Sequence, residues 1–185
     1  VGAMYVKSGL KLPAFITGGG QENGNRSGTE NTQGISGLGL ATELAYDNLA
    51  EKQRHIINLN NRLREGLMSE LDDIIVNGTI DMGVDVSDYG KRFPSVLNIS
   101  FLGARGEVIL HTLEQDEIFV STGSACSSHK NSDSHVLAAM GLGHKEIEGA
   151  IRFSISEFNT LEEMDEAAAK VSAAVKRFRR LGSFR

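Results

Sequence analysis

Hydrophobic residues recur at helical spacing through the first half of the chain. The apolar residues of this pattern are Ile35, Leu38, Ala41, Leu44 and Ala45, continued by Ile56, Leu59, Leu63 and Leu67 with charged residues on the other face. The period predicts one long, bent helix from about Thr32 to Leu71. Gly34, Gly37 and Gly39 lie near its start, where a glycine costs about 1 kcal/mol relative to alanine, so we expect close backbone packing there.

The second half of the chain changes to strand patterns. Short apolar runs predict strands at residues 74–76 and 118–120, and alternating apolar and polar residues predict half-buried strands at 97–101 and 151–155. In the last of these, Arg152 falls between Ile151 and Phe153, so we expect its side chain to point away from the apolar layer.

Three helices complete the predicted layer. They cover residues 106–113, residues 134–140 and a stripe that starts after a capping box formed by Thr160 and Glu163. A sheet with helices on it after residue 70 corresponds to an α+β arrangement. Residues 1–6 also read as a strand, and the chain opens without a methionine as though inside an element, which suggests part of a longer protein.

A glycine-rich loop precedes the first helix. Three consecutive glycines at 18–20 can expose backbone N–H groups to an anion, although no P-loop lysine accompanies them. The following Arg26-Ser-Gly-Thr-Glu-Asn31 supplies a guanidinium and a hydroxyl, which suit a phosphate or a carboxylate. The alternative for this segment is ordinary helix capping by Asn31 or Thr32.

The only cysteine of the chain, Cys126, lies in a run of small residues, Val120-Ser-Thr-Gly-Ser-Ala-Cys-Ser-Ser-His129. No large hydrophobic side chain anchors residues 127–133, which predicts a thiol on a mobile loop of about residues 121–134. A free cysteine also packs well as a small buried hydrophobe. The neighbouring serines, together with His129 and Lys130, favour an exposed, reactive thiol, because nearby positive charge stabilises the thiolate.

The amino-acid composition limits the classes of partner that are expected. A net charge of −5 and a pI near 5.6 give no electrostatic reason to expect nucleic acid or an anionic membrane. The basic run at 176–180 is explained by cations at a helix C-terminus. One cysteine can form neither an intrachain disulfide nor an iron–sulfur cluster by itself, so no metal site is expected. Without a signal peptide or a membrane-spanning run, a reducing cytoplasm is the default location.

Three motifs, taken together and in this order, resemble those of the pyridoxal-phosphate-dependent cysteine desulfurases of the NifS/IscS type, which are class V aminotransferases. They are Arg26-Ser-Gly-Thr-Glu-Asn31, Ser121-Thr-Gly-Ser-Ala-Cys-Ser-Ser128 and Ile151-Arg-Phe-Ser154. The similarity covers essentially the whole chain, including His135-Val-Leu and Phe158-Asn-Thr-Leu-Glu-Glu163.

The resemblance implies the C-terminal half of an α/β, fold-type-I homodimeric enzyme. Residues 1–48 would complete the large cofactor-binding domain, and residues 49–185 would form the small C-terminal domain. The activity implied is conversion of L-cysteine to L-alanine, with sulfur held as a persulfide and passed to an acceptor protein. An iron–sulfur scaffold or a tRNA-thiolation enzyme would be that acceptor.

The same resemblance implies roles for four residues. Cys126 would accept the sulfur, and Arg152 would grip the α-carboxylate of the substrate, which fits the fork of a guanidinium. Thr29 would reach the phosphate of the pyridoxal phosphate bound by the other subunit. Arg26 would lie beside that cofactor, near the surface where sulfur acceptors dock.

Two departures from the family pattern change the expectations. Asn23 stands where many members have an arginine, which removes the basis for an acceptor contact at that position. The Schiff-base lysine of the family lies in a Ser-x-His-Lys motif a few residues upstream of where Val1 would fall, and no lysine here stands at that position. We therefore expect the chain by itself to be inactive.

Two other classes of function compete with this interpretation. One is a Cys–His hydrolase that uses Cys126 with His111, His129, His135 or His144. The other is a non-catalytic module for dimerisation or acceptor binding, whose chemistry is lost with the missing half.

Overall fold

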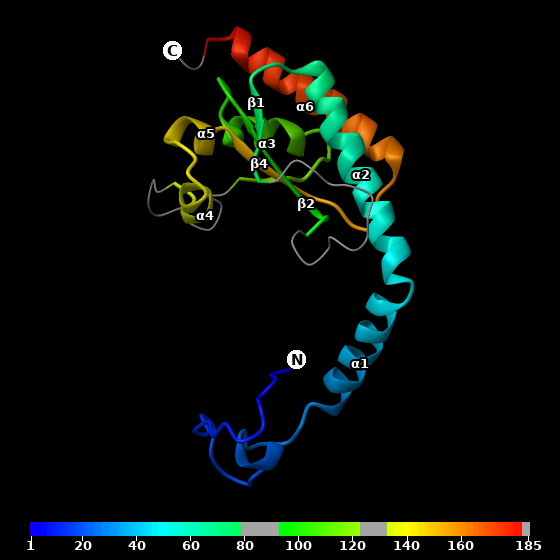
Figure 1. Ribbon diagram of the computed structural model, residues 1–185, viewed down its shortest axis with the longest axis vertical. Coiled ribbons are helices and arrows are strands. Elements are labelled where there is room, and N and C mark those ends of the chain that lie inside the picture. Colours follow the sequence, from blue (N-terminus) through cyan, green and yellow to red (C-terminus); the bar gives the residue numbers. More distant parts are fainter. Residues whose placement is uncertain (79–92, 123–132, 183–185) are drawn as a thin grey trace. The chain divides into compact units, whose positions relative to one another are not determined.

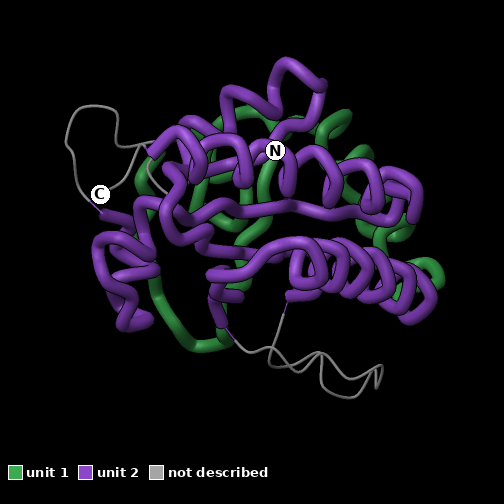
Figure 2. Tube along the Cα trace, turned by 90° about the horizontal axis from the view of Figure 1, so that it is seen from above, with its two compact units in different colours: residues 1–49 green, residues 50–185 purple. Residues whose placement is uncertain are grey.

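The computed structural model describes residues 1–78, 93–122 and 133–182. The chain divides into two units, Val1–Leu49 and Ala50–Arg185, which Figure 2 draws in different colours.

The first unit contains one long helix, α1 (Thr32–Tyr46), and one short 3-10 turn, η1 (Glu22–Gly24). Asn31 caps α1, because its Oδ1 accepts a hydrogen bond from the backbone N of Gly34 at 2.9 Å. The predicted capping by Asn31 is therefore observed.

The strand predicted at residues 1–6 is wrong. These residues are exposed and pair with no other described segment. An isolated bridge between Ile16 and Arg26 is the pairing found in this unit. A strand persists only where a neighbouring chain satisfies its N–H and C=O groups, and this unit offers none to residues 1–6.

α1 buries none of its residues. Its large apolar side chains are exposed, namely Ile35, Leu38, Leu40, Leu44 and Tyr46. A Cβ built on Gly37 or Gly39 meets nothing within 4 Å, so the close packing expected at these glycines is not found among the described residues. An apolar helix surface of this extent is typical of a segment that packs against another surface.

The long helix predicted from Thr32 to Leu71 is two helices. α1 ends at Tyr46, and α2 (Leu49–Glu70) begins three residues later. Asp47 takes an extended conformation and Asn48 a left-handed one, with φ of 51°. The apolar residues recur at helical spacing on both sides of this break, so the hydrophobic pattern does not reveal it. Asparagine is among the residues that enter the left-handed region most readily.

The second unit is built on a four-stranded antiparallel sheet in the order β1-β2-β4-β3 (Figure 1). Its strands are β1 (Ile74–Val76), β2 (Val96–Phe101), β3 (Ser121–Thr122) and β4 (Ala150–Ser154). The strand predicted at 118–120 is displaced to 121–122. Ile118 and Val120 instead pack, partly buried, against the core.

Four further helices belong to this unit: α3 (Gly106–Glu114), α4 (His135–Ala139), α5 (His144–Glu148) and α6 (Leu161–Arg180). The helix predicted at 134–140 is α4, and α5 was not predicted. The predicted capping box begins α6, since Thr160 Oγ1 accepts from the N of Glu163 at 3.2 Å and Glu163 Oε2 accepts from the N of Thr160 at 3.0 Å. No helix in the described ranges is long and apolar enough to cross a membrane.

One face of the sheet carries the core. Leu97, Ile99 and Phe101 of β2 and Ile151 and Phe153 of β4 are buried there. The apolar faces of α2, α3 and α6 belong to the same cluster, with Leu63, Ile109 and Val171 almost fully buried. The alternating strand residues therefore face away from these helices, and this opposite face carries the candidate site.

Arg179 stabilises the end of α6 through specific hydrogen bonds, in addition to the favourable charge of a cation at a helix C-terminus. Its guanidinium donates to three backbone carbonyls, those of Leu102 at 2.9 Å, Asp72 at 2.8 Å and Asp73 at 2.9 Å. The end of α6 is thus joined to the residues just before β1 and just after β2.

Gly149 allows the chain to turn from α5 into β4. A Cβ at this position would lie 2.5 Å from the carbonyl O of Phe101, whose N donates to Gly149 O at 2.9 Å. Gly149→Ala is therefore expected to lower the free energy of unfolding by about 1–3 kcal/mol, measured by urea denaturation. Gly143→Ala is the matched control, because its Cβ would lie 3.6 Å from Glu146 at a φ of −79°. Equal losses in both variants would contradict this account.

Candidate functional site

Arg152 lies near the middle of β4 with its side chain exposed, while its neighbours Ile151 and Phe153 are buried. The predicted orientation is therefore confirmed. Its guanidinium makes no hydrogen bond or ion pair with any residue that the structure describes. An arginine with free donors on an exposed sheet face can bind a carboxylate or a phosphate through two parallel hydrogen bonds.

A row of polar side chains crosses the sheet at Arg152. The register pairs Arg152 with Asn98 of β2 on one side and with Ser121 of β3 on the other. Residues directly opposite in antiparallel strands project to the same face, with Cβ atoms about 4.5–5.5 Å apart. The two neighbours of Arg152 in this row are thus uncharged hydrogen-bonding side chains.

Cys126, the predicted nucleophile, lies outside the described residues, as does His129. The chain enters its segment from β3, and Cys126 follows Thr122 by four residues in the sequence. Ser121, the first residue of β3, is the partner of Arg152. Four residues span at most about 14 Å, so the Cys126 segment starts from a strand directly beside Arg152.

Arg26 and Thr29, the predicted cofactor ligands, lie together in the first unit, where both are exposed. Arg26 Nη1 donates to the carbonyl O of Thr29 at 3.5 Å. This leaves the Thr29 hydroxyl and most of the guanidinium donors available to a ligand. Arg26 and Thr29 thus lie in the first unit, whereas Arg152 lies in the second.

Gln21 and Ser27 hold the Arg26–Thr29 loop in shape. Gln21 Oε1 accepts from the N of Gly28 at 3.0 Å, and the buried Ser27 accepts through Oγ from the N of Gly20 at 3.3 Å. Neither residue stands out in the sequence. Their contacts lie within a loop, where the periodic pattern of a helix or strand does not indicate which side chains meet.

The Cys–His hydrolase alternative pairs Cys126 with a histidine, and both Cys126 and His129 lie outside the described residues. His111 Nδ1 lies 3.0 Å from Glu114, and His144 Nδ1 lies 2.8 Å from Asp133. Both are exposed local contacts. Among the described residues, no group of three His, Cys, Asp or Glu side chains could hold a metal ion.

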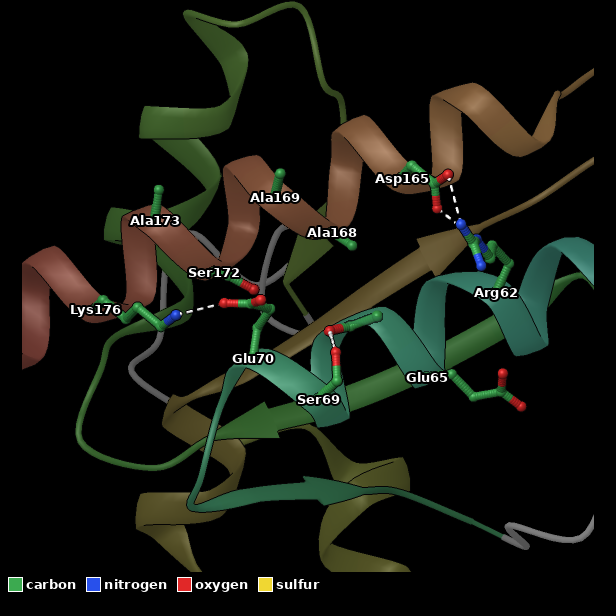
Figure 3. Close-up of a pocket in the computed structure, with 11 residues that line it drawn as sticks. Arg62, Glu65, Ser69, Glu70, Asp165, Ala168, Ala169, Ser172, Ala173 and Lys176 are labelled. Atoms are coloured by element: carbon green, nitrogen blue, oxygen red, sulfur yellow. Dashed lines mark hydrogen bonds and ion pairs between the residues drawn. The ribbon is translucent and has the colours of Figure 1, made fainter.

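A groove of about 690 Å³ runs between α2 and α6 (Figure 3). Its floor is made of small residues, and a Cβ on Gly66 would meet that of Ala168 at 2.9 Å, so the two helices approach closely here. Arg62 pairs with Asp165 at one end, and Lys176 with Glu70 at 2.7 Å at the other. None of the predicted site residues lines the groove, which we interpret as a feature of helix packing.

These two ion pairs shift the charges that they contain. The hydrogen bonds from Arg62 hold the pKa of the Asp165 carboxyl below its usual value, and those contacts raise the pKa of Arg62. The hydrogen bond from Lys176 likewise lowers the pKa of Glu70. All four groups are exposed, so they tune the surface of the α2–α6 pair and have no part in the polar row.

The family model described as aminotransferase class-V matches residues 1–166 of the chain. The Clostridium botulinum protein named cysteine desulfurase IscS is 41% identical over 181 residues, which are 98% of this chain and 44% of that protein. A cysteine desulfurase of Sinorhizobium fredii is 41% identical over 179 residues, 97% of this chain and 44% of that protein. The chain therefore spans less than half the length of these relatives.

Two solved structures agree with the sequence comparisons. A NifS-like protein has a TM-score of 0.77 at 32% identity, covering 94% of this chain and 41% of that one. The NifS-like protein of Rickettsia africae has a TM-score of 0.71 at 29% identity, covering 90% of this chain and 41% of that one. The predicted fold class, a part of an α/β pyridoxal-phosphate-dependent enzyme, is confirmed by these likenesses.

Proposed function

Because the chain belongs to the aminotransferase class-V family, we propose that it is the C-terminal part of a cysteine desulfurase, which converts L-cysteine to L-alanine and carries the sulfur on Cys126 as a persulfide. The pairing of Ser121 with Arg152 carries this proposal. Because of this pairing, the strand that leads to the only thiol of the chain lies beside Arg152, whose donors have no partner among the described residues.

Arg152 binds the substrate through its carboxylate. The guanidinium fork matches the two oxygens of a carboxylate, and no acidic side chain competes in the polar row on either side of it. Holding the amino acid by this end orients the rest of the substrate, so that its sulfur can meet the thiol that follows β3.

Cys126 acts as a thiolate that attacks the sulfur of L-cysteine. A bond forms between the two sulfur atoms, and the bond between the substrate sulfur and its β-carbon breaks. The thiol sulfur is oxidised to the persulfide, and the β-carbon is reduced and takes up a proton to give L-alanine. In total, L-cysteine and the Cys126 thiol are converted to L-alanine and a persulfide on Cys126.

Pyridoxal phosphate, on which the family depends, supplies the electron sink for this reaction when bound. Arg26 and Thr29 fit its phosphate, since they present a guanidinium and a hydroxyl that are close together and exposed. The Ser-x-His-Lys sequence that the chain contains, Ser127-Ser-His-Lys130, directly follows Cys126, whereas the family's motif lies upstream of the Arg26 segment. The covalent attachment of the cofactor is thus assigned to sequence outside the 185 residues.

The exposed apolar side chains of the first unit support its assignment to a larger cofactor domain and a dimer. α1 offers five large hydrophobic residues to another surface, and residues before it such as Tyr5 and Phe15 are also exposed. In this proposal a second identical subunit contacts this region, and Thr29 reaches the phosphate bound by that subunit. The sulfur then passes, in the cytoplasm, to an acceptor such as an iron–sulfur scaffold or a tRNA-thiolation enzyme.

The proposal is tested with the full-length protein loaded with pyridoxal phosphate. On addition of L-cysteine it is expected to form L-alanine and protein persulfide in equal amounts in the first turnover, measured by amino-acid analysis and by mass spectrometry of the Cys126 peptide. The 185-residue chain alone is expected to form neither and to give no borohydride-trapped pyridoxyl-lysine. Absence of alanine from the full-length protein would overturn the proposal.

A further inference from the structure

We propose that Asn98 is a second ligand of the substrate carboxylate beside Arg152, and that Asn77 is the positioning residue that orients the Asn98 amide. This inference rests on the proposed function, because it takes Arg152 as the residue that binds the carboxylate. It adds two side chains for which the sequence pattern had suggested no role.

Asn98 occupies the position from which a second donor can reach a ligand of Arg152. It lies directly opposite Arg152 in the β2–β4 register, on the face away from the core. Asn98 is half-buried and Arg152 is exposed, while Ser100, two residues along β2, is fully buried. The pair therefore lies where this face opens to solvent.

Asn77 holds the Asn98 side chain in one orientation. Its Nδ2 donates to Asn98 Oδ1 at 2.6 Å and to Ser100 Oγ at 2.8 Å, and its backbone N donates to the carbonyl O of Asn98 at 2.8 Å. A carboxamide has one accepting and one donating end. Because Asn77 occupies the accepting end of Asn98, the NH2 group is the end left without a partner among the described residues.

The orientation of Asn98 suits an anion. Its Nδ2 donates to no other residue in the described part of the chain, and Arg152 likewise has free donors. A carboxylate accepts about four hydrogen bonds, of which an arginine fork supplies two. An amide NH2 beside the fork adds a donor, whereas the reversed amide would place an oxygen against the carboxylate.

The contact of Asn77 with Asn98 is formed although it leaves Asn77 Oδ1 buried, with no hydrogen-bond partner among the described residues. Leaving a buried carbonyl unsatisfied is unfavourable. In this arrangement Asn77 presents its donating end to Asn98 Oδ1 and to Ser100 Oγ, which accepts here, and the Asn98 NH2 group is directed away from Asn77.

The test uses the full-length, cofactor-loaded protein and two probes, L-alanine and ethylamine, titrated through the absorbance of the cofactor. L-alanine has a carboxylate and ethylamine has none. Asn98→Ala is expected to raise the dissociation constant of L-alanine about 5- to 20-fold, the loss of one hydrogen bond to a charged group, and to leave that of ethylamine unchanged. The KM for L-cysteine is expected to rise with little change in kcat.

Two further variants separate positioning from packing. Asn77→Asp replaces the donor by an acceptor, so Asn98 must turn its NH2 toward position 77, and L-alanine affinity is expected to fall as in Asn98→Ala. Asn98→Asp keeps the acceptor for Asn77 but puts a negative charge beside Arg152, and is expected to weaken L-alanine binding further. Ser154→Ala, on the same face of β4, is the control and is expected to bind both probes normally.

The outcomes distinguish this inference from the proposed function. If Arg152→Ala weakens L-alanine binding and Asn98→Ala does not, the inference is overturned and the function stands. If neither variant changes L-alanine binding, the role of Arg152 fails as well. Equal weakening of L-alanine and ethylamine by Asn98→Ala would assign Asn98 to packing, and normal L-alanine binding by Asn77→Asp would remove the positioning role of Asn77.

Discussion

Cys126→Ser in the full-length protein is expected to reduce the formation of L-alanine from L-cysteine by roughly 10³-fold or more, as expected when the attacking group of an enzyme is removed. A serine hydroxyl has nearly the size of the thiol, but it is a poor nucleophile toward sulfur at neutral pH and cannot carry a persulfide. L-alanine is quantified by amino-acid analysis, and the persulfide by alkylation and mass spectrometry.

Binding of L-alanine to Cys126→Ser is expected to be normal, because the carboxylate contact belongs to Arg152 and not to the thiol. Ser127→Ala is the matched control in the same segment and is expected to retain turnover. A Cys126→Ser protein that still produces alanine would show that a different group accepts the sulfur, and the proposed function would lose its nucleophile.

Local periodicity was sufficient to place Arg152 and Asn98 on half-buried strands. Alternation alone predicted the exposure of Arg152, since neighbours on a strand project to opposite faces and Ile151 and Phe153 are apolar. A spacing of three residues likewise predicted the capping box of Thr160 and Glu163. These features need only the chain geometry within a few residues.

The errors have causes that periodicity does not contain. The break after Tyr46 depends on the left-handed conformation of Asn48, and the apolar spacing runs on across it. The strand expected at residues 1–6 lacks a partner in its unit, and the one at 118–120 is displaced because, among the described residues, β3 pairs with β4 at Ser121 and Thr122. A strand is defined by its neighbour as much as by its own residues.

The contacts that shape the site join residues distant in the sequence. Asn77 reaches Asn98 and Ser100 across more than twenty residues, and Arg179 reaches carbonyls more than seventy residues away. In the sequence these side chains resemble those of ordinary turn or surface residues. Only the β1–β2 register and the packing of α6 bring them to their partners.

Arg152 and Asn98 illustrate how one strand pair can serve both stability and recognition. Leu97, Ile99 and Phe101 of β2 and Ile151 and Phe153 of β4 fill the core, whereas Asn98 and Arg152 lie on the opposite face, half-buried and exposed. A substitution at position 152 is therefore expected to alter binding without removing core contacts. This separation makes the arginine at position 152 suitable for a direct test.

Arg152→Ala in the full-length protein is expected to raise the KM for L-cysteine about 10- to 100-fold, because losing a charge-assisted, two-fold hydrogen-bonded contact costs about 1.5–3 kcal/mol. Arg152→Lys is expected to raise the KM for L-cysteine less than Arg152→Ala does, because lysine keeps the positive charge and loses the planar fork. The absorbance of the bound cofactor is expected to stay unchanged in both variants.

Arg62→Ala provides the control for this measurement, because it also removes an exposed arginine of the second unit but from the α2–α6 groove. It is expected to leave the KM unchanged. Since the side chain of Arg152 is exposed and has no partner among the described residues, its loss breaks no contact that holds the fold. An Arg152→Ala protein with a normal KM and a lost cofactor spectrum would assign the guanidinium to the cofactor, and the carboxylate of the substrate would need another ligand.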